Sequence, residues 1–476
     1  MSERIRLLKR SLIATALGGV IALLIVAVGC GGGSSTTPLG AAPNSSAVQV
    51  KIGDDPDDSV VAFEITVNSV VLTDQSGATV NALSAPTTLE LTHLADTNEP
   101  LSFLNIKQDT YTQAAITVSN PEIVYLNALG QAVEKQLTMT DTVTVTFNPA
   151  LVVGPGSSVV NLDLNLAQSL NINLASGSVA VNPTFVITTS AVPPEGNEDQ
   201  ENEDNGQVQE AWGIVGTVAS NSFTMTNGMG SQLLTFNVDS RTSFEDIGGL
   251  SQITPGMLLK VKAVTQPDGS LLARRVKAVE MDNASEADGI ITAVSGTPAT
   301  QLSLLDQDGV GNGMTANLLG KTLNVGVTPN TVFSLPEDVD VSNLPFAPVF
   351  DATTVHAGQR VEADTNNGVN PGMGPASASL SASNVQLMRQ AVHGTVANYN
   401  SSGSGQFTFT LNLPVDSYLT RLSNGSVTSI TVIQQPSTEL RNLNSVSNGA
   451  NIRVRGVLFW TGSGFTMVAT RIVGVQ

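Results

Sequence analysis

One cysteine, Cys30, is the residue whose type and position predict the most specific chemistry in this sequence. It is the only Cys among 476 residues, and it follows a basic segment, Arg4–Arg10, and an uncharged, mostly apolar run, Ser11–Val28. A basic segment, an apolar run and a small residue before the cut make up a secretory signal. We therefore predict that residues 1–29 are a signal peptide and that the chain leaves the cytoplasm.

The segment Ala27-Val28-Gly29-Cys30 resembles the lipobox of bacterial lipoproteins. The resemblance implies that Cys30 carries diacylglycerol and becomes the N-terminus of the mature chain. Residues 30–47 would then be the lipidated Cys and a flexible tether, with acyl chains that anchor at about 0.8 kcal/mol per buried methylene. The alternative is an uncleaved helix, since the apolar run is at the lower limit for crossing a bilayer. Gly31, where an Asp would suggest inner-membrane retention, favours the outer membrane or cell surface.

Four carboxylates around Pro56 are the candidate metal ligands: Asp54, Asp55, Asp57 and Asp58. Their mutual repulsion is one that a divalent cation could relieve, and oxygen ligands favour Ca²⁺. The alternative is a solvated turn. The segment Asp306–Asn312 partly matches the spacing of a calcium loop, but a hairpin loop explains its Asn, Asp and Gly residues more simply.

Catalytic motifs are missing from the sequence. It has no Gly-x-Ser-x-Gly elbow, no His-Glu-x-x-His pair and no phosphate-binding glycine loop followed by Lys. Its three histidines, His93, His356 and His393, fall in different segments. A Ser-His-Asp site or a carboxylate pair assembled from distant residues stays open, but we expect no enzyme and no resident cofactor.

The overall charge argues against nucleic acid as a partner. Lys and Arg total 21 against 40 Asp and Glu, a net charge of −19 that repels phosphate backbones. We interpret the local basic pairs Lys260 and Lys262, and Arg453 and Arg455, as solvated strand faces. One Cys also excludes a disulfide framework.

Between residues 48 and 192, apolar and polar residues alternate, as in Val48-Gln49-Val50-Lys51-Ile52 and Phe63-Glu64-Ile65-Thr66-Val67. A period of two with many Val, Ile and Thr predicts half-buried strands. We therefore predict an antiparallel β-sandwich over 48–192. The strands around Gly53-Asp54-Asp55-Pro56 resemble the DUF4382 family, an uncharacterised domain of bacterial lipoproteins, which implies no known activity. Residues 193–210 are rich in carboxylates and poor in apolar residues, and predict an acidic linker.

The rest of the chain repeats itself three times, over 211–282, 285–388 and 390–476. Gly213-Ile214-Val215-Gly216-Thr217-Val218 recurs as Gly289-Ile290-Ile291-Thr292-Ala293-Val294, and again as Val392-His393-Gly394-Thr395-Val396. In each copy four more predicted strands follow, so each copy is predicted to be a small five-stranded barrel. The middle copy departs most, with insertions near 306–321, 336–355 and 366–376.

The order of these strands, with an Asp268-Gly269 hairpin before the last strand of the first copy, resembles the DUF5666 family. Strand number and spacing look OB-like. The whole chain is thus predicted to be all-β, with a sandwich followed by three OB-like barrel repeats.

We expect a noncatalytic lipoprotein, anchored to the cell envelope at the outer membrane or cell surface, that acts as a structural or interaction module. Its expected partners are the membrane, through the lipid on Cys30, and envelope proteins or polysaccharide. The alternative is a binding protein for polysaccharide or a divalent cation, using the turn near Asp54 or the inserted loops of the middle repeat. The few aromatic residues weaken the polysaccharide alternative.

Overall fold

The computed structural model describes residues 44–55, 58–94, 98–193, 205–227, 233–279, 285–307, 319–336, 339–365, 379–401 and 406–475. All of them belong to one compact unit, Asn44–Gln476, and the other unit, Met1–Pro43, lies outside the described residues. The predicted signal peptide, Cys30, most of the tether and most of the acidic linker therefore also lie outside them. None of the helices in the described part of the chain has the length and apolar sequence of a membrane-spanning helix.

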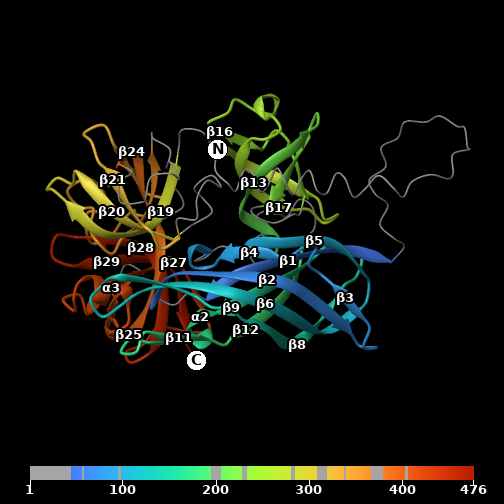
Figure 1. The fold of residues 1–476 in the computed structure, drawn as a ribbon, viewed down its shortest axis with the longest axis horizontal. Coiled ribbons are helices and arrows are strands. Elements are labelled where there is room, and N and C mark those ends of the chain that lie inside the picture. The colour runs from blue at the N-terminus through green and yellow to red at the C-terminus, as the bar shows by residue number, and fades with distance from the viewer. Residues whose placement is uncertain are drawn as a thin grey trace, which may run out of the picture. The chain divides into compact units, whose positions relative to one another are not determined.

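The first part of the unit contains two β-sheets, coloured blue to green in Figure 1. The strands of one sheet are β1 (Ser45–Asp55), β5 (Glu99–Lys107), β9 (Ser158–Asn165) and β12 (Phe185–Ala191). The strands of the other are β2 (Val60–Asp74), β3 (Thr79–Asn81), β4 (Thr87–Glu90), β6 (Thr110–Leu126), β7 (Ala132–Gln136) and β8 (Thr140–Val152). A hairpin of β10 (Leu170–Asn173) and β11 (Ser178–Val181), the 3-10 helix η1 (Thr92–Leu94) and the short helix α2 (Leu166–Ser169) complete this part.

Alternation along the strands produces a core between the two sheets. Val50 and Ile52 of β1 are fully buried in one apolar cluster with Ile65 of β2 and Ile116 of β6. The predicted two-layer β domain is therefore confirmed. One pairing differs from the antiparallel expectation: β1 and β9 run parallel, with Val50 opposite Val160. These strands are far apart in sequence, so no tight hairpin fixes their relative direction.

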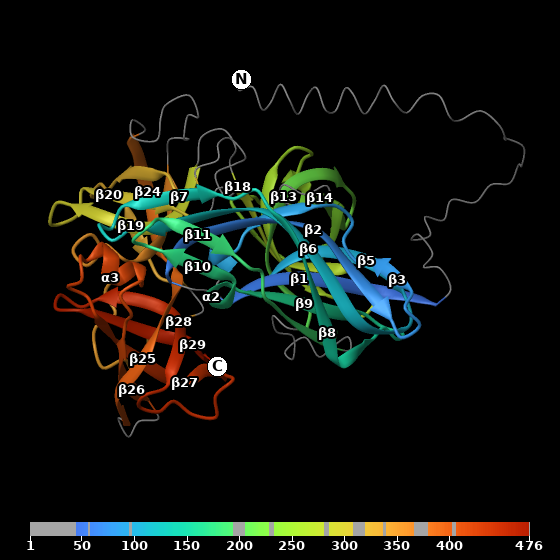
Figure 2. The same ribbon diagram turned by 60° about the horizontal axis from the view of Figure 1, so that its bottom comes forward.

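Three further sheets follow in chain order (Figures 1 and 2). The first contains β13 (Gln207–Val218), β14 (Ser222–Asn227), β15 (Leu233–Asn237), β16 (Ser243–Glu245), β17 (Leu258–Thr265) and β18 (Leu271–Val279), with the 3-10 helix η3 (Leu250–Gln252) between β16 and β17 in the chain. The second contains β19 (Ser285–Ser295), β20 (Gln301–Asp306), β21 (Thr322–Gly326), β22 (Val332–Ser334), β23 (Arg360–Thr365) and β24 (Ser379–Leu387). The third contains β25 (Arg389–Ser401), β26 (Phe407–Asn412), β27 (Ser429–Arg441), β28 (Asn451–Trp460) and β29 (Phe465–Gly474), with the short helix α3 (Tyr418–Leu422) between β26 and β27 in the chain.

All three sheets share one strand order. The third is a closed barrel, β25-β26-β27-β29-β28, and the pairings β15–β18 and β21–β24 join the same positions in the other two. The predicted OB-like barrel repeats are therefore confirmed. The third strand of the predicted five-stranded unit is split into two strands in the first repeat, β15 and β16, and in the second repeat, β21 and β22. In the third repeat it is one continuous strand, β27, with a register shift between Gln434 and Glu439.

The glycine that opens each repeat marks a close approach of the first two strands. A Cβ on Gly213 would lie 1.7 Å from the Thr226 carbonyl oxygen. On Gly289 or Gly394 it would lie 2.2 Å from a carbonyl oxygen of the second strand. The repeated Gly in the sequence thus has the same steric cause in all three barrels.

Two strands of the third barrel are buried on both faces. Val457 and Phe459 of β28 and Val468 of β29 belong to the apolar core of the second repeat, whereas Val454 and Leu458 face their own barrel core. Strands of an isolated barrel would alternate between core and solvent. The second and third repeats therefore share part of their cores.

Candidate functional site

A buried carboxylate lies where the turn between β1 and β2 meets the third barrel. The Asp58 side chain is 0% exposed, and its Oδ1 contacts Nδ1 of His393. Its Oδ2 accepts a hydrogen bond from Ser417 Oγ at 2.5 Å. The main-chain oxygen of Asp58 accepts a bond from the Tyr418 N–H at 2.8 Å. All three partners come from the third repeat, so this barrel holds the turn by both its side chain and its main chain.

The short helix α3 supplies a second contact to the sandwich. Arg421 is 6% exposed, and its Nη1 donates to the carbonyl oxygens of Ser59 at 3.2 Å and Leu126 at 2.6 Å. Hydrogen bonds from a charged donor are stronger than those between neutral groups. A helix this short gains its stability from packing rather than from helix propensity, and Tyr418 and Leu419 are both buried. Together, α3 and the Asp58 turn join the sandwich to the third barrel.

A small, partly open cavity lies beside this junction, with a volume of about 30 Å³. Asp58, Gln307 and Tyr418 are among its lining residues. Nε2 of Gln307 donates to the Val61 carbonyl at 2.5 Å, while its Oε1 has no hydrogen-bond partner among the described residues. A water molecule needs about 10–15 Å³, so the cavity has room for about two waters, whereas pockets for small ligands enclose about 300 Å³ or more. The cavity therefore has the size that suits bridging water and is much smaller than a pocket that buries a small ligand.

Tyr418 lines this cavity as a neutral hydrogen-bonding group. Burial raises the pKa of its phenol well above the ordinary value, and the charge of Asp58 acts in the same direction. The phenol oxygen is the partner of Gln390 Nε2. Tyr418 therefore keeps its proton across the physiological range.

Arg360 also lines the cavity, but its guanidinium group is paired with a carboxylate of the same repeat. Its Nε donates to Asp288 Oδ1 at 2.9 Å, and its Nη2 donates to Oδ2 at 2.6 Å. This is the two-pronged geometry that suits guanidinium and carboxylate. Arg360 therefore serves the repeat's own structure and leaves little positive charge for an anionic ligand.

Ser417, Asp58 and His393 are the residue types of a hydrolase triad, but their connections differ. In a triad the imidazole lies between Ser and Asp and takes the Ser proton. Here both Ser417 Oγ and His393 Nδ1 bind the carboxylate, and Ser417 is 0% exposed. The arrangement fixes a junction and does not join a nucleophile to a base.

The structure places only part of the predicted metal site. Asp58 is bound by Ser417 and His393; the side chains of Asp54 and Asp55 and the whole of Asp57 lie outside the described residues. Within the described ranges, no group of three or more His, Cys, Asp and Glu is placed to hold a metal ion. The Asp54–Asp58 cation site and its Ca²⁺ stay a prediction.

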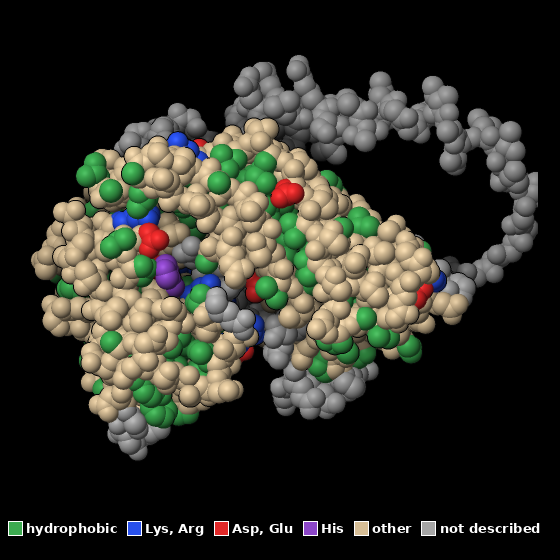
Figure 3. Space-filling view, turned by 90° about the horizontal axis from the view of Figure 1, so that it is seen from below, with side chains coloured by type: hydrophobic (Ala, Val, Ile, Leu, Met, Phe, Trp, Pro, Cys, Tyr) green, Lys and Arg blue, Asp and Glu red, His purple; other side chains and the backbone are tan. Residues whose placement is uncertain are grey.

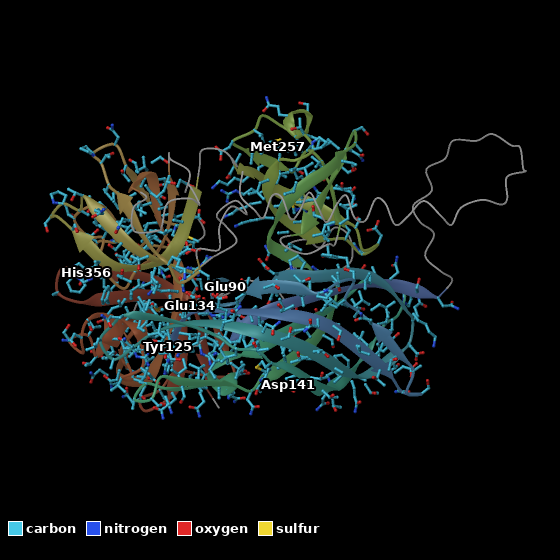
Figure 4. The ribbon with its side chains drawn as sticks, in the orientation of Figure 1. Glu90, Tyr125, Glu134, Asp141, Met257 and His356 are labelled. Carbon is cyan, nitrogen blue, oxygen red and sulfur yellow. The ribbon has the colours of Figure 1, made fainter. Side chains whose placement is uncertain are left out.

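The predicted loop 306–312 is also only partly described. Asp306 is fully buried and Gln307 faces the cavity, while residues 308–318 lie outside the described part. Two of the three histidines have described side chains. His393 meets Asp58, and His356 (labelled in Figure 4) stacks on Trp460 with ring centroids 4.0 Å apart.

The first barrel covers polar residues of β1. Gln49 and Lys51 are 2% and 0% exposed, although their alternation with valines suits a solvated face. Lys51 Nζ donates to the Gln207 carbonyl oxygen at 2.6 Å, and Thr265 Oγ1 donates to Gln49 Oε1 at 2.7 Å. The predicted Asp-Gly hairpin also reaches β1, since a Cβ on Gly269 would lie 2.3 Å from Cβ of Ala47. This face of the sandwich is a polar interface.

The described part of the 336–355 insertion contacts the third barrel. Phe346 packs edge-on against Phe459 of β28, with ring centroids 5.4 Å apart. Gln435 Nε2 donates to the Asp340 carbonyl oxygen at 3.0 Å, and Gln406 Nε2 donates to that of Asn343 at 3.0 Å. This insertion, one of the loops considered for ligand binding, therefore joins the second and third repeats.

The basic pairs also differ from a solvated strip. Arg453 and Arg455 of β28 are 3% and 5% exposed, and Lys260 lies 3.6 Å from a carboxylate oxygen of Glu362 in the second repeat. The interpretation of these residues as solvated faces was therefore wrong for the two arginines. On the face shown in Figure 3, charged side chains are few and apolar ones are scattered. Scattered apolar side chains are normal on protein surfaces.

Comparison with known proteins identifies one segment of the chain. The model of a family described as "Domain of unknown function (DUF5666)" matches residues 213–277. No curated protein matches the sequence. The likeness of the second and third repeats to this family, and of residues 48–192 to DUF4382, stays a prediction. The matched residues 213–277, which make up most of the first barrel, are similar to this family.

Proposed function

We propose that this protein is a noncatalytic lipoprotein of the bacterial envelope, anchored by a lipid on Cys30, whose sandwich and barrels act together as a structural or interaction module. The observation that carries the noncatalytic part is the use of the buried polar groups. Asp58, Ser417, Arg421 and Lys51 all bond across contacts between parts of the chain. The cavity beside Asp58 has a volume of about 30 Å³, which is room for about two water molecules.

The anchoring part of the proposal rests on the sequence around Cys30. The basic segment and the apolar run form the pattern of a secretory signal, and Ala27-Val28-Gly29-Cys30 resembles the lipobox at which bacterial lipoproteins are acylated. The proposed partners are the membrane, through the lipid on Cys30, and envelope proteins, with no nucleic acid; polysaccharide is the partner under the alternative of a binding protein. The proposed location is the outer membrane or cell surface.

A thermal-shift and glycan-array experiment on the complete exported chain separates this proposal from the alternative. The module proposal predicts the same melting temperature with Ca²⁺ and with a chelator, and no array signal above that of a heat-unfolded sample. A calcium-dependent rise that Asp54→Asn with Asp57→Asn abolishes, or a reproducible glycan signal, would instead support a binding protein.

A further inference from the structure

The first half of β8 is an open edge of the sandwich. This strand pairs with β6 on one side, and among the described residues no strand pairs with its other side. It also lies near β12 of the other sheet, but no backbone pairing joins the two. The side chains that alternate along this half are exposed: Thr140, Thr142, Thr144 and Thr146. An open edge presents N–H and C=O groups to which another strand can bond.

The pairing with β6 shows which residues of β8 face the open edge. The Asn120 N–H donates to the Met139 carbonyl oxygen at 3.0 Å, and bonded residues alternate along an antiparallel pair. With the register of these strands, Asp141 and Val143 direct their main-chain groups to β6, so the threonines between them direct theirs away from it. Accordingly, the Thr142 N–H donates to Oδ1 of Asp141 at 2.8 Å (Asp141 is labelled in Figure 4) and not to β6.

The same half of β8 lacks most of the features that prevent strand pairing. Natural edge strands are protected by charged residues, prolines and bulges. The neighbouring edge strand β7 carries a Glu and a Lys, and the second half of β8 has Pro149 and a register shift opposite Tyr111–Gln113. Between residues 140 and 147, Asp141 is the only charged residue. This segment is therefore suited to pairing with another strand.

We propose that this edge of β8 pairs with the same edge of a second copy of the chain, so that the protein forms a symmetric dimer through its sandwich. When two copies run antiparallel about Thr144, this residue faces its own copy and Thr142 faces Thr146. Asp141 then faces Phe147, so no two charged side chains meet in the pair. The Thr142 N–H exchanges the Asp141 carboxylate for a main-chain oxygen of the second copy. This association would be independent of the lipid on Cys30.

The sandwich already contains the side-chain contacts that such a pair would repeat. The Thr117 and Thr142 hydroxyls lie 3.0 Å apart between β6 and β8, and those of Thr66 and Thr88 lie 2.8 Å apart between β2 and β4. Pairs of threonines stabilise neighbouring strands. A symmetric pair also uses the open edge of both copies, so the assembly ends at the dimer. The net charge of −19 opposes association of two copies at low salt.

Sedimentation equilibrium of the complete exported chain with Cys30→Ser, which removes the lipid, measures this association. We expect the average mass to rise towards twice that of the monomer as protein concentration and salt increase. Thr142→Lys with Thr146→Lys sets like charges opposite each other in the pair, and should weaken association by about tenfold or more. The matched control is Thr142→Lys with Thr146→Glu, which sets unlike charges opposite each other in the same register and should retain the dimer.

A backbone variant and hydrogen exchange test the strand pairing itself. Thr144→Pro removes an N–H that faces away from β6, where an edge strand tolerates proline, and should also weaken association. Peptides covering 140–148 should be more protected in concentrated than in dilute samples, whereas those covering 132–136 of β7 should not change. The proposal is overturned by a monomer at every concentration and salt, by a dimer without added protection of 140–148, or by equal association of the Lys–Lys and Lys–Glu variants.

Discussion

Phe459 of β28 and Phe346 of the second repeat pack edge-on, with ring planes at 67°. Phe459 is 1% exposed and belongs to the core of the second repeat although it is part of the third. This pair packs the two repeats against each other. A substitution in the core of one repeat should therefore also destabilise the other repeat.

The substitution Phe459→Ala should lower the free energy of unfolding by about 3–5 kcal/mol, because it removes a buried ring and leaves a cavity. Chemical denaturation followed by circular dichroism measures the loss. Phe407→Ala is the matched control, since Phe407 is only half-buried and stacks on Tyr399 of its own barrel. Equal losses in the two variants would contradict the shared core.

The glycine at the start of the third repeat should not tolerate a side chain. Gly394→Ala would place Cβ 2.2 Å from the Asn412 carbonyl oxygen, so the first two strands must move apart and the melting temperature should fall by several degrees. The control is Gly464→Ala, because nothing lies within 4 Å of the Cβ added there. This variant should change the melting temperature by about a degree or less. An unchanged melting temperature in Gly394→Ala would show that the close approach of the two strands is not the reason for glycine at this position.

Arg421 should contribute strongly to the sandwich–barrel junction. Arg421→Ala leaves the carbonyl oxygens of Ser59 and Leu126 without this donor, and should cost about 2–3 kcal/mol. Arg441→Ala removes a more exposed arginine that pairs with Glu439, and should change stability by about 0.5 kcal/mol or less. Urea unfolding of both variants measures the two losses of stability. Similar losses for Arg421→Ala and Arg441→Ala would contradict the role of Arg421 in the junction.

Glu122 should make stability fall with rising pH. Burial raises the pKa of its carboxyl group, and the charge of Glu134 (labelled in Figure 4) adds to the rise. A carboxyl whose pKa is higher in the folded state favours folding while protonated, and this contribution is lost as the pH rises from the ordinary value through the raised one. Glu122→Gln should therefore melt above the parent protein at pH 7, with a difference that vanishes below about pH 4.

Glu439 provides the opposite case for the same measurement. Burial alone would raise the pKa of its carboxyl group, but Arg441 and Arg471 hold it below the ordinary value. Glu439→Gln should therefore melt below the parent protein at pH 7, and the difference should shrink as the pH falls. Parallel pH profiles for Glu122→Gln and Glu439→Gln would refute the assignment of either shift.

The sequence was sufficient to predict the barrels because their signals are local and repeated. Gly213, Gly289 and Gly394 each have a Val or Ile two positions further on, and each marks the same strand approach. Alternation likewise predicted the strands of the sandwich. The parallel direction of β1 and β9 could not be predicted, because residues distant in sequence decide it.

The junctions could not be predicted from the sequence because their partners are remote. Ser417 and His393 lie 359 and 335 positions from Asp58, so the acidic turn was interpreted as a solvated turn or a cation site. Lys51 and Arg453 alternate with apolar residues as solvated side chains would, yet both are buried. Alternation shows that a face is polar, but it does not distinguish water from the polar surface of another domain.

Lipid attachment is the central claim of the proposed function, and mass spectrometry of the N-terminal peptide from the native protein tests it most directly. The account predicts a peptide that begins at Cys30 with the added mass of a diacylglyceryl group, whereas Cys30→Ser should give no such peptide. An unmodified Cys30 thiol at the mature N-terminus, or a peptide that still contains residues 1–29, would contradict it.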